Sequence, residues 1–224
     1  MQIIYLHGFA SSPHGYKSNW FKDRFEADFG VQVHIPDLNQ PSFEHLRLSA
    51  MLDTCAATVE TLTKGDIVDD IMLIGSSLGG LCACHFLDQN GVHAALAQRI
   101  KRVILLAPAF DFAANRSEQF GQAWLKEWKE SGSFPFYHYA HNREIPVDYG
   151  FAEDVLRYDS QQVDIIQQIL IIHGKHDEVV NPQQSITFAQ QHDNVQLHLV
   201  ESDHTLNNQV EYIYGQMQKH FGLL

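Results

Sequence analysis

A serine between glycines is the residue of this sequence whose surroundings most clearly indicate chemistry. Gly75-Ser76-Ser77-Leu78-Gly79 matches the pattern GxSxG and directly follows the apolar run Ile71 to Ile74. Such a serine lies on a strained turn from a strand into a helix, and small residues two positions to either side let strand and helix approach closely. Ser77 has glycines at both positions, whereas Ser76 would have Ile74 and Leu78. The alternative is a glycine-rich turn with a solvated serine; the strand-turn-helix setting favours Ser77 as a nucleophile.

A serine hydroxyl attacks at neutral pH only when a base takes its proton and an acid orients that base. The run Ile169 to Ile172 is followed by His173-Gly174-Lys175-His176-Asp177-Glu178, and the run Val195 to Val200 by Glu201-Ser202-Asp203-His204. The order Ser77, Asp177, His204 is the nucleophile, acid, base order of the α/β-hydrolase arrangement. We therefore predict His204 as base and Asp177 as acid, with Glu178 as the reserve acid.

Asp203 is next to His204 in the chain and cannot easily fold back to orient it, so we predict a solvated turn residue there. Attack on an acyl carbon also requires hydrogen-bond donors for the developing oxyanion. The N–H of Leu78, at the start of the helix after Ser77, is one candidate. The N–H of Phe9, in the loop after the run Gln2 to Leu6, is the second, because Gly8 permits a sharp turn there. A plain turn is the alternative for that loop.

Two segments resemble a known family. Leu6-His7-Gly8-Phe9-Ala10-Ser11-Ser12-Pro13 and Gly75-Ser76-Ser77-Leu78-Gly79-Gly80 are similar to the signature segments of the small bacterial esterases of the YqiA/YcfP type, within the α/β-hydrolase superfamily. The resemblance implies a serine esterase or thioesterase with Ser77 as nucleophile, Asp177 as acid, His204 as base, and Phe9 and Leu78 as oxyanion donors. A longer aromatic insertion after Ala109 departs from that pattern, and it bears on the substrate.

Alternating strands and helices must position these residues. Several apolar runs are hydrophobic on both faces, which is typical of parallel strands covered by helices on each side. The runs are Gln2 to Leu6, Val31 to Ile35, Ile71 to Gly75, Val103 to Ala107, Ile169 to His173 and Val195 to Val200. Between them, one helical pattern runs from Ser42 to Gly65, and another lies near the carboxyl end of the chain. We predict an α/β-hydrolase fold with a mostly parallel, doubly wound sheet of about six strands.

One long stretch interrupts the alternation of strands and helices. Residues 110–158 contain 12 of the 25 aromatic residues and no convincing strand. Phe120, Trp124 and Trp128 are spaced by four, which would give one helix an aromatic face, and further aromatic residues follow in a predicted loop broken by Pro135. We predict a helical lid at about 110–165 with these three residues at the substrate, within a single domain of residues 1–224. The alternative is that the rings only seal the insertion onto the sheet.

Composition excludes several classes of function. The 224 residues are 45% hydrophobic, which is enough for one filled core, and no apolar run approaches the length of a membrane span. A net charge of −12 without a basic cluster disfavours nucleic-acid binding. The absence of a signal-like start and of a disulfide framework predicts a cytoplasmic protein. Cys82 and Cys84 would point to opposite sides of a helix, and no His/Cys cluster is present, so we expect no metal and no cofactor.

The sequence therefore predicts a serine hydrolase that cleaves small-molecule carboxylic esters or thioesters through an acyl-enzyme on Ser77. The alternative is a non-catalytic module with the same fold that binds a ligand or docks a partner. The sequence leaves the oligomeric state, the acyl length and the alcohol or thiol group open.

Overall fold

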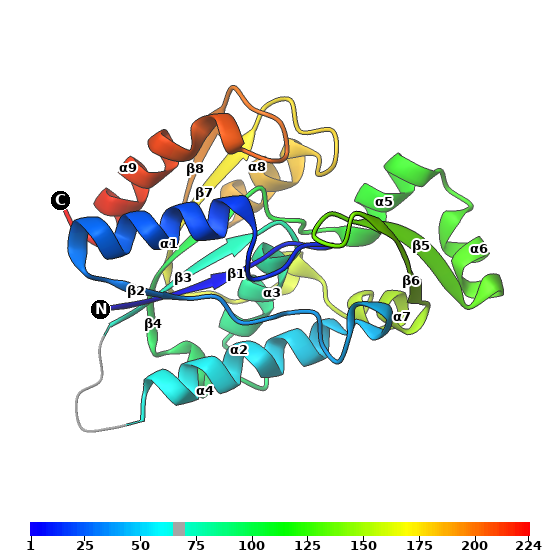
Figure 1. The fold of residues 1–224 in the computed structure, drawn as a ribbon, viewed down its shortest axis with the longest axis horizontal. Helices are drawn as coiled ribbons and strands as arrows, with labels where there is room; N and C mark the ends of the chain where they lie inside the picture. The colour runs from blue at the N-terminus through cyan, green and yellow to red at the C-terminus, as the bar shows by residue number, and fades with distance from the viewer. Residues whose placement is uncertain (65–69) are drawn as a thin grey trace.

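Six parallel strands form a central sheet in the part of the chain that the computed structural model describes, residues 1–64 and 70–224. Their order across the sheet is β2-β1-β3-β4-β7-β8 (Figure 1). The strands are β1 (Gln2–Leu6), β2 (Gln32–His34), β3 (Ile71–Ser76), β4 (Ile100–Leu106), β7 (Gln168–Gly174) and β8 (Val195–Val200). Each coincides with one of the six apolar runs, with bounds that differ by a few residues, so the predicted fold class is confirmed.

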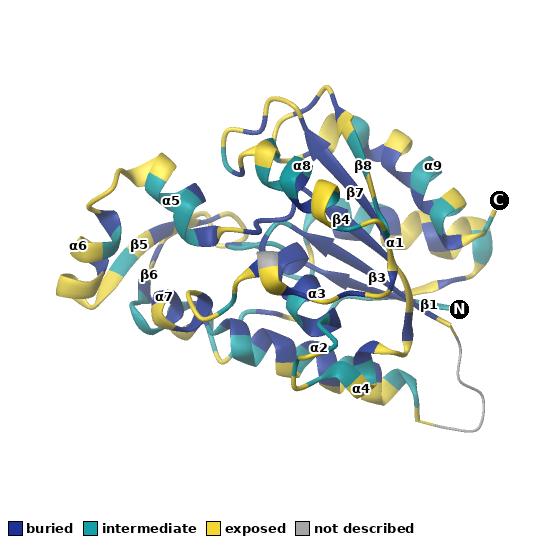
Figure 2. Ribbon diagram, turned by 180° about the vertical axis from the view of Figure 1, so that it is seen from behind, coloured by how far each residue is buried: buried dark blue, intermediate teal, exposed yellow. Residues whose placement is uncertain are grey.

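Helices cover both faces of this sheet, because successive side chains of a strand point to opposite faces. Ile3 and Tyr5 of β1 pack with α1 (Tyr16–Phe29) and α9 (Val210–Phe221). Ile4 and Leu6 belong to the core on the other face, under α2 (Leu48–Leu62), α3 (Leu78–Leu87) and α8 (Pro182–Gln191). Figure 2 shows the buried strands between helices whose outer faces are exposed. No helix of the described ranges has both the length and the apolar character needed to cross a bilayer.

The helix expected from Ser42 begins later than predicted. A short 3₁₀ turn, η1 (Phe43–His45), comes first, and Leu46 and Arg47 then have extended backbone angles, so α2 starts at Leu48. The Arg47 guanidinium lies 2.7 Å from Asp148 of the insertion, which holds this segment away from the helix axis. Gly65, the predicted end of the helix, lies outside the described residues. The short helix α4 (Ala94–Ala97) precedes β4.

The insertion between β4 and β7 contains two strands as well as helices, which corrects the prediction of a stretch without strands. Its elements are α5 (Phe112–Phe120), α6 (Trp124–Ser131), β5 (Ser133–His138), β6 (Arg143–Asp148), α7 (Gly150–Val155) and η2 (Ser160–Gln162). β5 and β6 form an antiparallel hairpin in which Pro135 faces Pro146. Proline is tolerated there because each strand of a two-stranded sheet is an edge strand. Pro135 was therefore a misleading sign of a loop.

Candidate active site

The turn between β3 and α3 holds Ser77 in a strained conformation. Its φ of 53° and ψ of −117° lie in a region that side-chain-bearing residues rarely adopt. The Ser77 N–H donates to Leu106 O of β4 at 2.9 Å, and its carbonyl accepts the Ala109 N–H at 3.1 Å. Ser77 thus joins two adjacent strands of the sheet at their carboxyl ends, where parallel α/β sheets bind ligands.

Glycines around this turn allow contacts that no larger residue permits. A Cβ on Gly79 would lie 2.2 Å from Leu6 O of β1, and one on Gly75 would lie 2.6 Å from Gly79 O. A Cβ on Gly8 would lie 3.2 Å from the Cβ of Ser77. A Cβ at 2.2 or 2.6 Å would overlap backbone atoms, and one at 3.2 Å would be tighter than ordinary contact. The strand and the helix therefore meet at Ser77 because Gly75 and Gly79 have no Cβ, and Gly8 lets the loop after β1 come close to the same residue.

Ser77, His204 and Asp177 form one chain of hydrogen bonds, although 127 positions separate the first two. The Ser77 hydroxyl donates to His204 Nε2 at 3.0 Å, and His204 Nδ1–H donates to Asp177 Oδ2 at 2.7 Å. Asp177 follows β7 and His204 follows β8, the two strands at one side of the sheet. The segments that carry them can approach closely because Gly174 has no Cβ. A Cβ there would lie only 2.4 Å from Ser202 O. The three residues singled out from the sequence therefore lie together.

The carboxylate of Asp177 is buried and fully surrounded by donors. Burial alone would raise its pKa, but hydrogen bonds from His173 and His204 outweigh that effect and hold the pKa well below its usual range. The N–H groups of Val179 and Val180 donate to the other carboxylate oxygen at 2.9 and 2.8 Å. Asp177 is therefore ionised near neutral pH and fixed in position.

His173, at the end of β7, is a residue to which the sequence analysis gave no role. Its ring is fully buried, with Nε2 3.0 Å from Asp177 Oδ2 and Nδ1 2.7 Å from Ser185 Oγ of α8. The ring therefore donates to the carboxylate from Nε2 and accepts the serine hydroxyl at Nδ1. The spacing of four between His173 and Asp177 was the available signal, but a histidine at a strand end has many ordinary uses.

Glu178 and Asp203, the carboxylates next to Asp177 and His204 in the chain, are both exposed. Glu178 is exposed, and the structure gives it no hydrogen bond to a described residue, so the geometry does not support it as the reserve acid. Asp203 is exposed as well, and its carboxylate accepts the N–H of Thr205 at 2.9 Å. It closes a turn beside His204, in agreement with the turn residue expected there.

The loop after β1 brings Phe9, whose N–H is an expected oxyanion donor, into the walls of the same cavities as Ser77. Leu38 N–H donates to His7 Nε2 at 3.0 Å, so the proton of this buried ring is on Nδ1, which donates to Gly8 O at 3.0 Å. Desolvation lowers the pKa of His7, consistent with the neutral ring. The Phe9 N–H is on the opposite edge of the same peptide. Among the described residues, neither this group nor the N–H of Leu78 donates to an acceptor.

Two cavities open beside Ser77 and His204. One, of about 400 Å³, is lined by hydroxyl-bearing residues of the loop after β1 and the start of α1; we call it the polar cavity. The other, of about 260 Å³, is lined by Phe120 of α5 and by Phe136 and Tyr137 of β5; we call it the aromatic cavity. Phe9 and Tyr139 border both cavities. Ser77 thus lies between two spaces, of which the polar cavity has more hydroxyl groups in its walls and the aromatic cavity more phenyl rings.

Of the three insertion aromatics expected at the substrate, Phe120 alone lines a cavity beside Ser77. Gly121 ends α5 with a φ of 90°, so Phe120 and the two tryptophans do not share one helix, which corrects the predicted aromatic face. Trp124 and Trp128 are buried among other rings of the insertion. Their indole N–H groups donate to Ser117 Oγ and Val147 O, both at 2.8 Å. In this structure the indoles pack the insertion and do not reach the cavities, as the alternative interpretation expected.

Two cations at the cavities were missed in the sequence. Arg116 of α5 lines the aromatic cavity and lies over the rings of Phe9, Phe112 and Phe136. Lys17 of α1 lines the polar cavity. Neither forms an ion pair with a carboxylate of the described residues. Isolated basic residues carry no motif, so only the fold reveals that they face the same serine.

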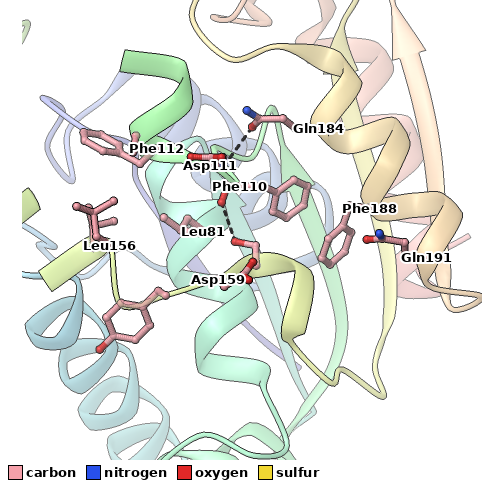
Figure 3. Close-up of a pocket in the computed structure, with 13 residues that line it drawn as sticks. Leu81, Phe110, Asp111, Phe112, Leu156, Asp159, Gln184, Phe188 and Gln191 are labelled. Carbon is pink, nitrogen blue, oxygen red and sulfur yellow. Dashed lines mark hydrogen bonds between the residues drawn. The ribbon is translucent and has the colours of Figure 1, made fainter. Parts of the chain in front are cut away.

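A third cavity, of about 410 Å³, lies apart from Ser77, between α5, α7 and α8 (Figure 3). The rings of Phe110 and Phe188 stack in its wall with centroids 4.2 Å apart, and Gln184 accepts the N–H of Asp111 at 3.3 Å. None of Ser77, His204 and Asp177 lines it. Within the described ranges, no three His, Cys, Asp or Glu side chains are placed to hold a metal ion.

Comparisons with known proteins identify the family and the fold of the chain. A family model described as "Uncharacterised protein family (UPF0227)" matches residues 2–221. A search of curated proteins finds no significant match. Among solved structures, Est1E from Butyrivibrio proteoclasticus superposes with a TM-score of 0.77 at 21% identity, covering 99% of this chain and 86% of that one. A further structure, described as ferulic acid bound to Est1E, has a TM-score of 0.75 at 20% identity and covers 99% and 89% of the two chains.

The similarity extends to a mammalian protein. The alpha/beta hydrolase domain-containing protein 10 from mouse superposes with a TM-score of 0.73 at 19% identity, covering 97% of this chain and 88% of that one. At such identities the likeness establishes the fold. The family match and the shared fold confirm the resemblance to YqiA/YcfP-type proteins and the predicted α/β-hydrolase fold.

Proposed function

The chain belongs to the UPF0227 family and has the α/β-hydrolase fold, and from this premise we propose that it is a serine hydrolase of carboxylic esters or thioesters. The observation that carries the proposal is the hydrogen-bonded chain from Ser77 through His204 to Asp177. A histidine that accepts from a strained, half-buried serine and donates to an ionised buried carboxylate is arranged to remove the serine proton.

In the first half of the reaction, Ser77 Oγ attacks the acyl carbon while His204 Nε2 takes the hydroxyl proton. The carbonyl oxygen becomes an oxyanion, and the N–H groups of Phe9 and Leu78 are the proposed donors to it. The free state of both groups among the described residues supports this role. His204 then gives its proton to the departing alcohol or thiol, and an acyl-enzyme remains on Ser77.

In the second half, water enters where the leaving group stood. His204 takes a proton from the water, the hydroxide attacks the acyl carbon, and Ser77 Oγ leaves as its proton returns from His204. Asp177 stays ionised throughout and keeps the His204 proton on Nδ1, while His173 holds Asp177 in place. The cycle consumes one water and needs no cofactor.

The aromatic cavity supports an apolar or aromatic group on one side of the ester. Phe120, Phe136 and Tyr137 offer ring faces and edges within reach of Ser77, and such walls select by shape and apolar area. The ferulic acid of the Est1E structure is an aromatic carboxylic acid, which agrees in kind with such a group.

The proposal is tested with a fluorophosphonate probe and with p-nitrophenyl and thioester substrates of graded acyl length. We expect the wild type and Ser76→Ala to be labelled and Ser77→Ala to be unlabelled, because only Ser77 contacts His204. Ser76 is the matched control, since it carries the same hydroxyl at the adjacent position. A folded wild type that is neither labelled nor active on any of these substrates would favour the non-catalytic binding module instead.

A further inference from the structure

The polar cavity has a basic residue and no acidic residue in its described walls, unlike the acidic chain as a whole. The chain as a whole has a net charge of −12, yet no Asp or Glu is among the described residues that line this cavity. Its walls carry the ammonium of Lys17, the hydroxyls of Ser11 and Ser12, and the ring of His14. All of these groups can donate hydrogen bonds, and one of them is a cation. These donors suit a group that accepts hydrogen bonds, and they lie beside the rings of Tyr5, Phe9 and Tyr16 in the same walls.

Lys17 is half-buried and has no hydrogen bond or ion pair with a described residue. Desolvation lowers its pKa to about 8, while Asp177 and Asp203 act on it at longer range in the opposite direction. A pKa near 8 still leaves the ammonium mostly protonated at neutral pH. A desolvated charge without a partner is costly, and an anion brought into the cavity would relieve that cost.

The position of the cavity makes this charge relevant to the reaction. An ester held at Ser77 extends to both sides of its carbonyl carbon, and Ser77 and His204 line both cavities. An apolar group on one side fits the aromatic cavity, so the group on the other side enters the polar cavity. At about 400 Å³ that cavity has room for a group of several heavy atoms.

We propose that the polar cavity is an anion subsite in which Lys17 binds a carboxylate or phosphate on the substrate, so that the preferred esters are apolar on one side and anionic on the other. This inference rests on the proposed hydrolase function, because it names the chemistry of that function's substrate. Lys17 contributes the charge, and the neighbouring hydroxyls supply further donors to the anion's oxygens.

The test compares pairs of esters that differ only in charge. One pair carries the charge on the acyl side, p-nitrophenyl glutarate monoester against p-nitrophenyl valerate. A second pair carries it on the phenol side, with a carboxymethyl against an ethyl substituent, and a third replaces that carboxylate with a phosphate. We expect the wild type to prefer the anionic member in at least one pair. Lys17→Met should reduce this preference, the ratio of the two kcat/KM values, at least about tenfold, and Lys17→Arg should keep most of it.

A ratio of kcat/KM values cancels any loss common to both esters, so a general effect of the variant on folding does not imitate the result. Lys22→Met is the control, because Lys22 is an exposed lysine of the same helix and its removal changes the net charge equally. Its ratio should equal that of the wild type. A ratio that is unchanged in Lys17→Met, or that falls only in Arg116→Met, would overturn the proposal. So would a wild type that hydrolyses these esters without preference for any anionic one.

A second measurement does not require turnover, so that a failure of the hydrolase proposal can be told apart from a failure of this one. Glutarate and inorganic phosphate at millimolar concentration should raise the Tm of the wild type and of Lys22→Met, and the rise should be lost in Lys17→Met. Inactivity on all esters with a Lys17-dependent rise in Tm would reject the hydrolase and keep the anion site. If neither anion raises the Tm and no preference is seen, the anion site is rejected.

Discussion

The guanidinium of Arg116 lies over the ring of Phe9, with its central carbon 5.1 Å from the ring centroid. Arg116 is on α5 of the insertion, and Phe9 is on the loop after β1 whose N–H we propose as an oxyanion donor. A second contact joins the same segments, because Tyr139 N–H of the insertion donates to Ala10 O at 3.1 Å. The insertion thus contacts the proposed reaction centre through the loop that would hold the oxyanion.

This contact predicts that Arg116→Met lowers activity although Arg116 is outside the Ser77, His204, Asp177 chain. A cation over aromatic rings contributes about 0.5–2 kcal/mol, which corresponds to a fall in kcat/KM of roughly 2- to 30-fold if Phe9 loses its position. Steady-state kinetics on a neutral ester measure the effect. Arg99→Met removes an exposed arginine and should leave kcat/KM unchanged. Equal kinetics for both variants would show that α5 does not position Phe9.

Ser77 offers a prediction that separates chemistry from strain. Ser77→Ala and Ser77→Gly should both lose turnover by about 10⁴-fold or more. The glycine variant should be the more stable of the two by about 1 kcal/mol, because a φ of 53° with a ψ of −117° strains any residue that has a Cβ. Urea unfolding of the two variants gives the comparison. Equal stability would mean that the turn is not strained at this position.

Asp177→Asn should lower kcat by up to roughly 10⁴-fold and leave substrate binding nearly intact, because the amide cannot keep the proton of His204 on Nδ1. Glu178→Gln is the matched control, since Glu178 is the adjacent carboxylate and is exposed. It should retain wild-type kinetics. The reverse pattern, with Glu178→Gln inactive and Asp177→Asn active, would reject Asp177 as the acid.

The pKa of Asp177 also predicts how stability depends on pH. Its folded-state pKa lies below the ordinary value of 3.8, so the ionised carboxylate stabilises the folded state at pH values above 3.8. This contribution declines as the pH falls below 3.8, where the unfolded chain takes up a proton before the folded one does. The difference in free energy of unfolding between wild type and Asp177→Asn should therefore shrink from pH 5 to pH 3. Urea titrations at several pH values measure it, and a constant difference would contradict the shift.

The insertion aromatics should divide into two groups. Trp124→Ala and Trp128→Ala should each cost about 3–5 kcal/mol of stability and lower activity on all esters alike, because both indoles are buried. Phe120→Ala should have little effect on the Tm and should depress kcat/KM more for long or aromatic acyl groups than for acetate, because this ring lines the aromatic cavity. Melting curves and an acyl-length series on the three variants test the division. If Trp124→Ala instead melts like the wild type and loses activity only on long acyl groups, the prediction that this indole lies at the substrate would be supported.

The fold and the Ser77, Asp177, His204 order could be predicted because they depend on local patterns. Apolar runs such as Ile71 to Ile74 mark buried strands, and catalytic residues follow strand ends at recognisable positions. The roles of Lys17 and Arg116 could not be predicted, because they depend on the tertiary structure. Only the folded chain places these two side chains in the cavities beside Ser77. The hairpin of β5 and β6 was missed because Pro135 is unfavourable in most strands, and only the pairing shows that it lies on an edge.

The insertion leaves the sheet after β4 and returns at β7, and these two strands are direct neighbours in the sheet. Its ends therefore lie side by side, and Ser77, Asp177 and His204 are all outside it. Residues 110–167 are consequently a cassette whose exchange between members of the fold would leave Ser77, Asp177 and His204 in place, together with the Ala109 N–H that donates to the Ser77 carbonyl. A transplanted cassette must bring its own partner for Phe9, as Arg116 is here. In such a hybrid, the rate of reaction would depend on the protein that supplies the sheet, and the choice of apolar group on the protein that supplies the cassette.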